Sequence, residues 1–314
     1  MNKFLSDVLK GLRSSPKYLF SKYFYDQKGD ELFQKIMATD DYYLTNCEME
    51  IFSKQTAAIA DSVLKDDPLL DVIEFGAGDA TKSTFLLKEL VKRNAISTYF
   101  PVDISKNIID FLEKRLPEEI PQLNIHGLNG EYLQMLSQTN KFSTKRKLVL
   151  FLGANIGNFK FDEMPQFCKK LRGFLSENDM VLIGFDLKKD PRKILSAYDD
   201  KEGFTSLFNL NLLRRINHEL NGDFNLKKFQ HYATYDPENG ACKSYLVSLI
   251  KQQVCIAGEV INFEENETIF MEISQKYSMK QIDETAIACG FTPFAYFLDS
   301  KKYFVDVIWR VKRN

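Results

Sequence analysis

The stretch DVIEFGAGDATKST, residues 71–84, decides the fold of this chain. An apolar run ends in the acid Glu74, the glycines Gly76 and Gly78 follow, and small residues then begin a helical pattern. Glycines after a first strand let the backbone approach a ligand, and the N-terminus of the next helix offers N–H donors. The stretch therefore predicts a strand–turn–helix unit with a cofactor at the turn.

Outward from this turn, apolar strands alternate with amphipathic helices. Residues 81–93 carry apolar side chains at helical spacing, and a strand at 97–103 leads into a helix at 105–116 that Pro117 is expected to end. Further strands are predicted near 123–128, at 147–153 and at 177–186. This alternation predicts an α/β fold, with a parallel sheet covered by helices on both faces.

The alternation stops after residue 190. A helical, Asn-rich segment is followed over 228–274 by a pattern typical of antiparallel strands, and a helix ending at Gly290 then leads into a closing hairpin. We expect the N-terminal part and the insertion to form a second, α+β domain over the sheet edge where open α/β sheets bind their ligands. The expected segments are 1–60 and 191–274 for that domain, and 61–190 and 275–314 for the core.

Composition excludes several classes of protein. The 314 residues are 44% hydrophobic and 27% charged, with a formal net charge of −1, so nothing predicts a nucleic-acid or membrane partner. No apolar run reaches the ~20 residues of a membrane span, and the N-terminus is not a signal peptide. Five scattered cysteines indicate reduced thiols, and the three histidines lack metal-ligand spacing. We expect a cytoplasmic protein that holds no metal.

The glycine turn itself argues against a dinucleotide. The frame Gly76-Ala77-Gly78 lacks the third glycine of Gly-x-Gly-x-x-Gly, and Asp79 follows where it would repel a phosphate. A second acid, Asp103, ends the next strand 25 residues after Gly78. A cofactor without phosphates but with a ribose diol and a positive charge, S-adenosylmethionine (SAM), fits this set. The alternative is a tight turn without ligand, since each acid alone is typical of a helix cap or a solvated strand end.

Several further segments, spread from the N-terminal region to the last quarter of the chain, carry a resemblance. They are KYFYDQKGDELFQKI, DDYYLTNCEMEI, EFGAGDATKS, LFLGANIGNF, GFDLKKDPRKILSAYDD, FNLNLLRRINHELNGDF and MEISQKY. Together they resemble the histidine-specific, SAM-dependent methyltransferase family. The resemblance implies a Rossmann-like class I methyltransferase core, a substrate domain built from the N-terminal part and an insertion, and trimethylation of the α-amino group of free L-histidine. The product is histidine betaine (hercynine), a step toward ergothioneine.

The resemblance also implies roles for residues that bind the cofactor. Asp103 would hold the ribose hydroxyls, and Glu131 with Tyr132 would frame the adenine where the family usually has Asp-Phe. Tyr25 would lie by the methionine end, where it would also be catalytic. The remaining two cofactor residues are Gly76 and Lys82, in the turn.

For the substrate, the resemblance implies that Asn158 and Tyr198 bind the amino acid head and are catalytic, and that Tyr42 or its neighbour covers the substrate. Residues two apart in a strand share a face, so the side chains of Glu272 and Ser274 can hold the two nitrogens of an imidazole. Taken alone, the pair is typical of polar residues on a solvated strand face, and it is the resemblance that assigns them to the histidine ring.

Three further positions bear on the predicted site. A family methionine falls on Ser244, which leaves the shape of the side-chain pocket open. Thr45 and Glu48 are interpreted as a capping box of the next helix.

Other functions remain open at this point. The same chemistry could act on another amino acid or an indole amine, and a module could hold SAM without turnover. An NAD oxidoreductase and a nucleic-acid methyltransferase are less favoured. We expect a monomer.

Overall fold

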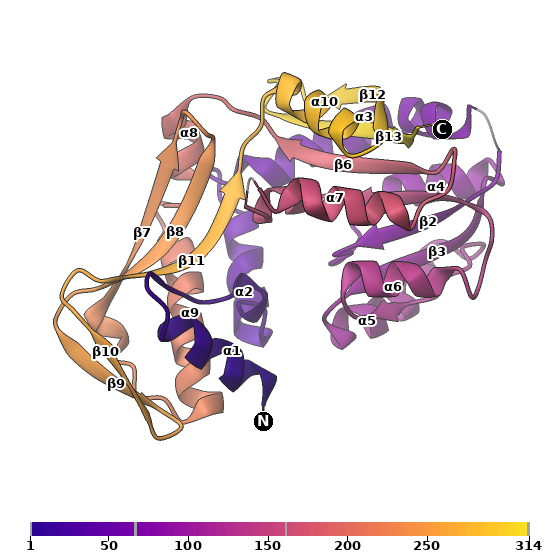
Figure 1. Ribbon diagram of the computed structural model, residues 1–314. Coiled ribbons are helices and arrows are strands. Elements are labelled where there is room, and N and C mark those ends of the chain that lie inside the picture. The colour runs from indigo at the N-terminus through magenta and orange to yellow at the C-terminus, as the bar shows by residue number, and fades with distance from the viewer. Residues whose placement is uncertain (1, 66–67, 161, 313–314) are drawn as a thin grey trace. The chain divides into compact units, whose positions relative to one another are not determined.

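The computed structural model describes residues 2–65, 68–160 and 162–312 (Figure 1). The chain divides into two compact units. The core unit comprises Leu44–Leu187 and Gln275–Asn314, and the appended unit comprises Met1–Tyr43 and Lys188–Ser274. Within the described ranges, no helix has both the length and the apolar character needed to cross a bilayer.

The core unit is built on a seven-stranded sheet of order β12-β13-β6-β5-β2-β3-β4. Strands β2 to β6 are parallel, and β13 runs antiparallel to both β6 and β12. Read in chain order, the parallel strands are arranged 3-2-1-4-5, the order of doubly wound Rossmann-like sheets. The predicted α/β core is therefore confirmed. The strands are β2 (Leu70–Phe75), β3 (Ile96–Asp103), β4 (Leu128–Asn129), β5 (Arg146–Phe151), β6 (Met180–Asp186), β12 (Phe291–Leu298) and β13 (Phe304–Val311).

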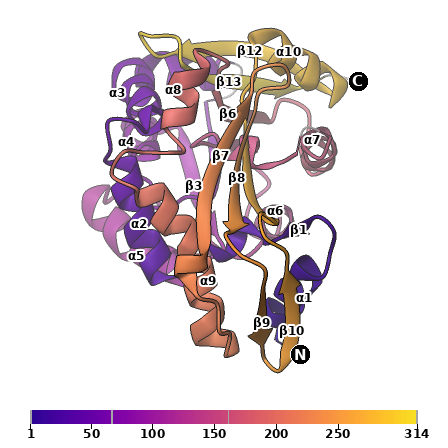
Figure 2. The same cartoon turned by 90° about the vertical axis from the view of Figure 1, so that its left-hand side faces the viewer.

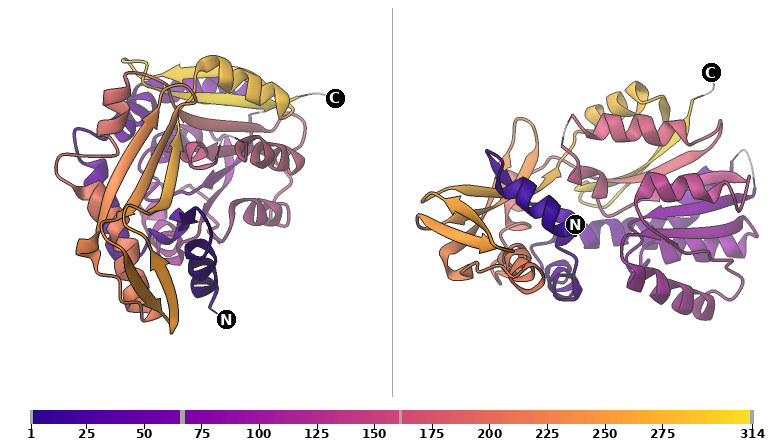
Figure 3. Two further views of the ribbon diagram at one scale, coloured as in Figure 1. Left: turned by 60° about the vertical axis from the view of Figure 1, so that its left-hand side comes forward. Right: turned by 60° about the horizontal axis from the view of Figure 1, so that its bottom comes forward.

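Helices cover the core sheet by burying apolar stripes. Side chains of α6, α7 and α10 form one cluster with residues of the sheet such as Phe75, Phe151 and Trp309. Figures 1 and 3 show α10 beside the C-terminal hairpin. The remaining helices, α3, α4 and α5, bury Phe52, Leu87 and Leu112 completely. The helices of this unit are α3 (Tyr43–Leu64), α4 (Ser83–Lys92), α5 (Lys106–Glu119), α6 (Tyr132–Thr139), α7 (Met164–Gly173) and α10 (Met279–Ala288).

Two details of the core differ from the sequence prediction. Helix α5 does not end at Pro117, which lies inside its last turn. A proline in the last turn removes one backbone hydrogen bond, because it has no N–H, but no later turn remains to be distorted. The helix therefore continues to Glu119. The unit boundary falls at Tyr43 and Leu44 rather than near residue 60, because α3 packs its apolar side chains, Ile51 and Ile59 among them, completely out of solvent with the core unit.

The appended unit combines helices with a four-stranded sheet of order β1-β11-β8-β7 and a two-stranded sheet of β9 and β10. Figure 2 shows the long strands β7 and β8 side by side, as in the hairpin that the turn at 236–240 predicts. Phe208 and Leu212 of α9 pack with Leu246 of β8 and Met271 of β11. The strands are β1 (Lys17–Tyr18), β7 (Phe229–Asp236), β8 (Ala241–Ser248), β9 (Gln252–Ile256), β10 (Glu259–Phe263) and β11 (Thr268–Gln275); the helices are α1 (Lys3–Leu12), α2 (Gln27–Met37), α8 (Pro191–Ser196) and α9 (Phe204–Leu220).

Candidate active site

The glycine turn follows β2 and is held by β3. Gly76 and Gly78 have φ of +64° and +52°, a left-handed conformation that glycine adopts without strain. The Gly76 N–H donates to the carbonyl of Val102 at 2.8 Å. A Cβ added to Gly76 would lie 3.0 Å from the Tyr132 hydroxyl, whereas one on Gly78 would meet nothing within 4 Å. The turn thus needs both glycines for its backbone, and space remains in front of the second.

Asp103 stands where β3 ends, directly beside this turn. One carboxylate oxygen accepts the Gly78 N–H at 3.3 Å, and the other accepts the Ser105 N–H at 2.9 Å. Burial raises the pKa of Asp103 above its ordinary value, although these N–H donors act against the rise. A carboxylate offers about four lone-pair sites. Asp103 can therefore fix the turn and still accept hydrogen bonds from a diol.

Tyr132 opens α6 against the same turn. Its ring stacks on Phe75, with centroids 5.0 Å apart and planes inclined by 13°. Burial, then the charges of Asp103 and Glu131, raise the pKa of Tyr132 well above its usual range, so its hydroxyl is protonated. Glu131 is exposed at the residue before the helix. An aromatic face, a carboxylate at a strand end and a second carboxylate on the rim therefore meet at the turn.

This donor set fits an adenosyl group better than a dinucleotide. Asp103 suits a ribose diol, and Tyr132 with Glu131 suits a flat base bearing an amino group. A pyrophosphate would instead face the carboxylates. Two cations lie near the turn, and both already have partners: the Lys82 ammonium contacts the buried carboxylate of Glu48, and the Arg115 guanidinium donates to the Asp79 carbonyl at 2.7 Å.

Glu48 is the residue whose role the sequence prediction missed. Helix α3 begins at Tyr43, so Glu48 lies within the helix rather than closing a capping box with Thr45. Its carboxylate is fully buried and accepts the Gly153 N–H at 2.7 and 3.0 Å. The capping-box interpretation of Glu48 is therefore wrong. The sequence signal for this buried role was an acid among the apolar residues that form the buried side of α3.

Asn158 lies on the neighbouring loop of the core unit. It is the last residue of the 3-10 helix η2 (Asn155–Asn158), which follows β5, and its side chain is exposed. Gly157 of η2 packs so closely on Gln275 that an added Cβ would lie 2.8 Å from its carbonyl oxygen. The loop that presents Asn158 is therefore fixed by close backbone packing.

In the appended unit, three of the expected substrate residues form two contacts, and a fourth, Glu272, contacts Ser244. The Tyr198 hydroxyl donates to the Ser274 hydroxyl at 2.7 Å, and the Tyr198 ring lies edge-on to Tyr42 at 6.3 Å. Glu272, two residues before Ser274 on β11, accepts a hydrogen bond from Ser244 at 3.4 Å. Tyr42, Tyr198 and Ser274 are thus brought together, and Glu272 shares strand β11 with Ser274.

Tyr25 lies at the other end of an aromatic row. Its ring is edge-on to Phe33 at 5.8 Å, and Phe33 is edge-on to Tyr42 at 6.2 Å. The Tyr25 side chain is 41% exposed. The row connects the three tyrosines of the predicted site that lie in the appended unit, Tyr25, Tyr42 and Tyr198, through ring contacts.

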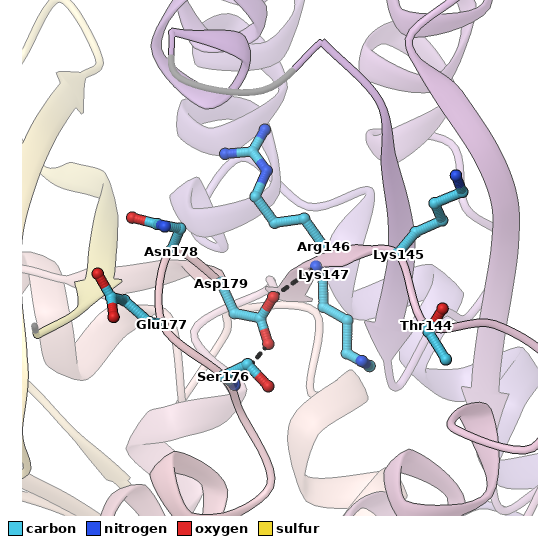
Figure 4. Close-up of a pocket in the computed structure, with 8 residues that line it drawn as sticks. All are labelled: Thr144, Lys145, Arg146, Lys147, Ser176, Glu177, Asn178 and Asp179. Atoms are coloured by element: carbon cyan, nitrogen blue, oxygen red, sulfur yellow. Dashed lines mark hydrogen bonds between the residues drawn. The ribbon is translucent and has the colours of Figure 1, made fainter.

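A polar cavity of about 280 Å³ lies elsewhere in the core unit, between residues 144–147 and 176–179 (Figure 4). It adjoins the starts of β5 and β6, whereas the glycine turn follows the end of their parallel neighbour β2. The Asp179 carboxylate accepts the N–H groups of Lys147 and Ser176, each at 2.7 Å. This carboxylate links the two segments that precede β5 and β6. The cavity therefore has a structural role and lies away from the candidate site.

Comparisons with known proteins extend over both units. The chain matches the family model described as "Histidine-specific methyltransferase, SAM-dependent" over residues 4–311. It is 30% identical over 295 residues to the histidine N-alpha-methyltransferase of Mycobacterium tuberculosis (strain CDC 1551 / Oshkosh), covering 93% of this chain and 90% of that protein. The ergothioneine biosynthesis protein 1 of Neurospora crassa is 28% identical over 303 residues, which are 93% of this chain and 33% of that protein. The 4-dimethylallyltryptophan N-methyltransferase easF of Claviceps fusiformis is 30% identical over 200 residues, 61% of this chain and 56% of that protein.

Proposed function

The chain belongs to the histidine-specific, SAM-dependent methyltransferase family, and on that premise we propose that it methylates the α-amino group of free L-histidine three times, to histidine betaine. The family makes it a SAM-dependent enzyme rather than a module that only holds the cofactor. The histidine N-alpha-methyltransferase that it resembles over 93% of its length supports the choice of substrate. A relative named ergothioneine biosynthesis protein 1 supports the proposal that the product is an intermediate toward ergothioneine.

The contact between Tyr198 and Ser274 is the observation that carries the proposal. A neutral imidazole has one N–H donor and one nitrogen acceptor. The Ser274 hydroxyl accepts from Tyr198 and so retains its own proton to donate to the acceptor nitrogen. Glu272, on the same strand, supplies an acceptor for the ring N–H. Together they match both nitrogens of a histidine side chain.

The cofactor set consists of Gly76, Asp103, Glu131 and Tyr132, with Lys82 opening the following helix. Gly76, with its positive φ, would let the backbone approach the ligand closely, and Asp103, which already accepts the Gly78 N–H, would also accept hydrogen bonds from the ribose. When bound, SAM supplies a methyl group on a positively charged sulfur, which an uncharged amine can attack from the opposite side. Tyr25 would lie near that end of the cofactor.

The protein's own task is to present a neutral amine. A peptide-terminal α-amino group has a reference pKa of ~8, and the neighbouring carboxylate raises the pKa of the amine in a free amino acid further, so losing its proton near neutral pH is modestly uphill and no strong base is needed. Asn158 and Tyr198 would hold the amino acid head through an amide and a phenol, which add no charge. Tyr42 would cover the substrate, because an aromatic face stabilises an amine that stays cationic after methylation. Positioning of this kind can contribute roughly 7–11 kcal/mol to the lowering of the barrier.

The experiment is incubation of the purified protein with SAM and a panel of free amino acids, with products identified by mass. We expect histidine to gain three methyl groups and other amino acids to remain unmodified. The second candidate is methylation of an indole amino acid, which the match to the Claviceps fusiformis enzyme favours. Preferential methylation of tryptophan or a tryptophan derivative would select that candidate and overturn the histidine assignment.

Replacement of Glu272 tests the recognition of the ring. A hydrogen bond to a charged acceptor contributes about 1.5–3 kcal/mol, so Glu272→Ala should raise the KM for histidine by about tenfold or more. Affinity for S-adenosylhomocysteine should stay at the wild-type value. Glu265→Ala, which removes an exposed acid from the turn before β11, is the matched control. An unchanged KM in Glu272→Ala would show that another residue recognises the imidazole.

A further inference from the structure

Glu48 joins two loops at the carboxyl ends of the core strands. It projects from α3 and is buried, with 0% of its surface exposed. Its carboxylate pairs with the ammonium of Lys82, which directly precedes α4 and follows the glycine turn. The same carboxylate accepts the N–H of Gly153, in the loop after β5, at 2.7 and 3.0 Å. One side chain thus contacts both the cofactor turn and the loop that carries Asn158.

The loop after β5 needs such support because it is strained. Gly153 and Ala154 have φ of +73° and +55°, and the left-handed conformation, which glycine adopts freely, is unfavourable for an alanine. Residues held this way persist where the surroundings fix them. Asn155 follows at once, and its amide nitrogen would lie 3.4 Å from a Cβ added to Gly76. The position of Gly153 therefore determines where Asn155 meets the glycine turn and where Asn158 is presented.

Space and charge around Glu48 are arranged for this side chain. A Cβ at Gly184 of β6 would lie 2.4 Å from a Glu48 carboxylate oxygen, so glycine leaves room for it there. Asp306 is paired in register with Gly184 from β13 and is fully buried. Burial, then the adjacent charge of Glu48, raise the pKa of Asp306 well above its usual range. A neutral Asp306 leaves Lys82 and Glu48 as a balanced ion pair.

We propose that Glu48 is a positioning residue that ties the cofactor turn to the Asn158 loop through its contacts with Lys82 and Gly153. Glu48 does not touch the reacting atoms; it sets the relation between the residues that bind SAM and the loop residue that binds the amino acid head. The role of Asn158 in this statement rests on the proposed function. The link from Glu48 to cofactor binding rests on the contacts within the core unit alone.

The test uses Glu48→Gln and Lys82→Met, singly and together, in the full-length protein. Both oxygens of Glu48 face donors, so a glutamine must turn its own NH₂ toward an N–H or an ammonium. We expect Glu48→Gln to weaken binding of S-adenosylhomocysteine by about tenfold in calorimetry, and to lower kcat more than it raises the KM for histidine. Exchange of the Gly153 amide proton should quicken by about tenfold, since a charged acceptor with two oxygens is replaced by at most one neutral amide oxygen. Glu50→Gln, on the same helix and paired at the surface with Lys54, is the matched control.

The double variant distinguishes a specific coupling between Glu48 and Lys82 from a general loss of stability. Since Lys82 and Glu48 act as a unit, the double variant should bind S-adenosylhomocysteine no more weakly than the weaker single variant. Binding within twofold of wild type in a folded Glu48→Gln protein, with unchanged exchange at Gly153, would overturn the proposal. Should Glu48→Gln not fold, Lys82→Met, which removes only the contact with the turn, must weaken binding of S-adenosylhomocysteine by about tenfold, and wild-type binding there would overturn the proposal equally. Binding and exchange are measured without histidine, so a failure to methylate histidine leaves this test intact.

Discussion

Glu74, the acid that precedes the glycine turn, should make the stability of the protein depend on pH. It is 4% exposed on β2, and the Tyr99 hydroxyl donates to it at 2.5 Å. Burial raises the pKa of Glu74 from 4.5 to about 7, although the hydrogen bond from Tyr99 acts against the rise. The folded protein therefore binds this proton more tightly than the unfolded chain does.

The sign and size of the effect follow from that difference. A raised carboxyl pKa contributes stability that is fully present below the unfolded value of 4.5 and is lost as the pH rises to about 7, with little change above it. The rise corresponds to at most about 3 kcal/mol. Between about pH 5 and about pH 8 the loss should be about 2–3 kcal/mol. Glu74→Gln keeps an acceptor for Tyr99 but cannot ionise, so it should escape this loss.

The assay is urea unfolding of wild type and Glu74→Gln across this pH range. Other carboxyl groups titrate equally in both proteins, so the difference in unfolding free energy isolates Glu74. It should move in favour of the glutamine variant as the pH rises. Glu50→Gln is the control: pairing with Lys54 lowers the pKa of Glu50, so this variant should show no such rise. Parallel stability curves for wild type and Glu74→Gln would refute the reasoning, as would a difference that moves the other way.

Two further variants test the cofactor turn and the space that surrounds Glu48. Asp103→Asn should weaken binding of S-adenosylhomocysteine by about tenfold in calorimetry, because a neutral amide replaces a charged acceptor. Asp110→Asn, at the surface, is the control and should bind like wild type. If Asp103→Asn and wild type bound with equal affinity, Asp103 would not hold the ribose. Gly184→Ala places a Cβ 2.4 Å from Glu48 and 2.9 Å from Phe304, so it should cost about 1–3 kcal/mol in urea unfolding. Gly173→Ala, where a Cβ meets nothing within 4 Å, is its control, and equal stability of the two variants would contradict the packing described.

Most of the core could be predicted from sequence because its elements are long and periodic. The run from Val72 to Phe75 and the apolar strand before Gly153 show a buried parallel strand directly, and the capping box of Ser278 and Gln281 marks the start of α10. Short elements gave no such signal. Strand β1 has two residues, Lys17–Tyr18, and its parallel pairing with Ile269 and Phe270 joins segments some 250 residues apart.

The candidate site was predictable where a motif fixes local geometry. Gly76, Gly78 and Asp103 meet as expected, since the turn and the strand end are adjacent in any parallel sheet of this order. The contacts of Glu48 could not be predicted, because they depend on which loop faces the buried side of α3. The link between Tyr198 and Ser274 likewise depends on tertiary packing, although the resemblance had chosen both residues.

The most direct test of the account is a crystal structure of the protein with S-adenosylhomocysteine and L-histidine. The account predicts ribose hydroxyls within hydrogen-bond distance of Asp103, and imidazole nitrogens in contact with Glu272 and Ser274. A histidine ring bound away from those two residues, or a ribose held by a residue other than Asp103, would contradict it.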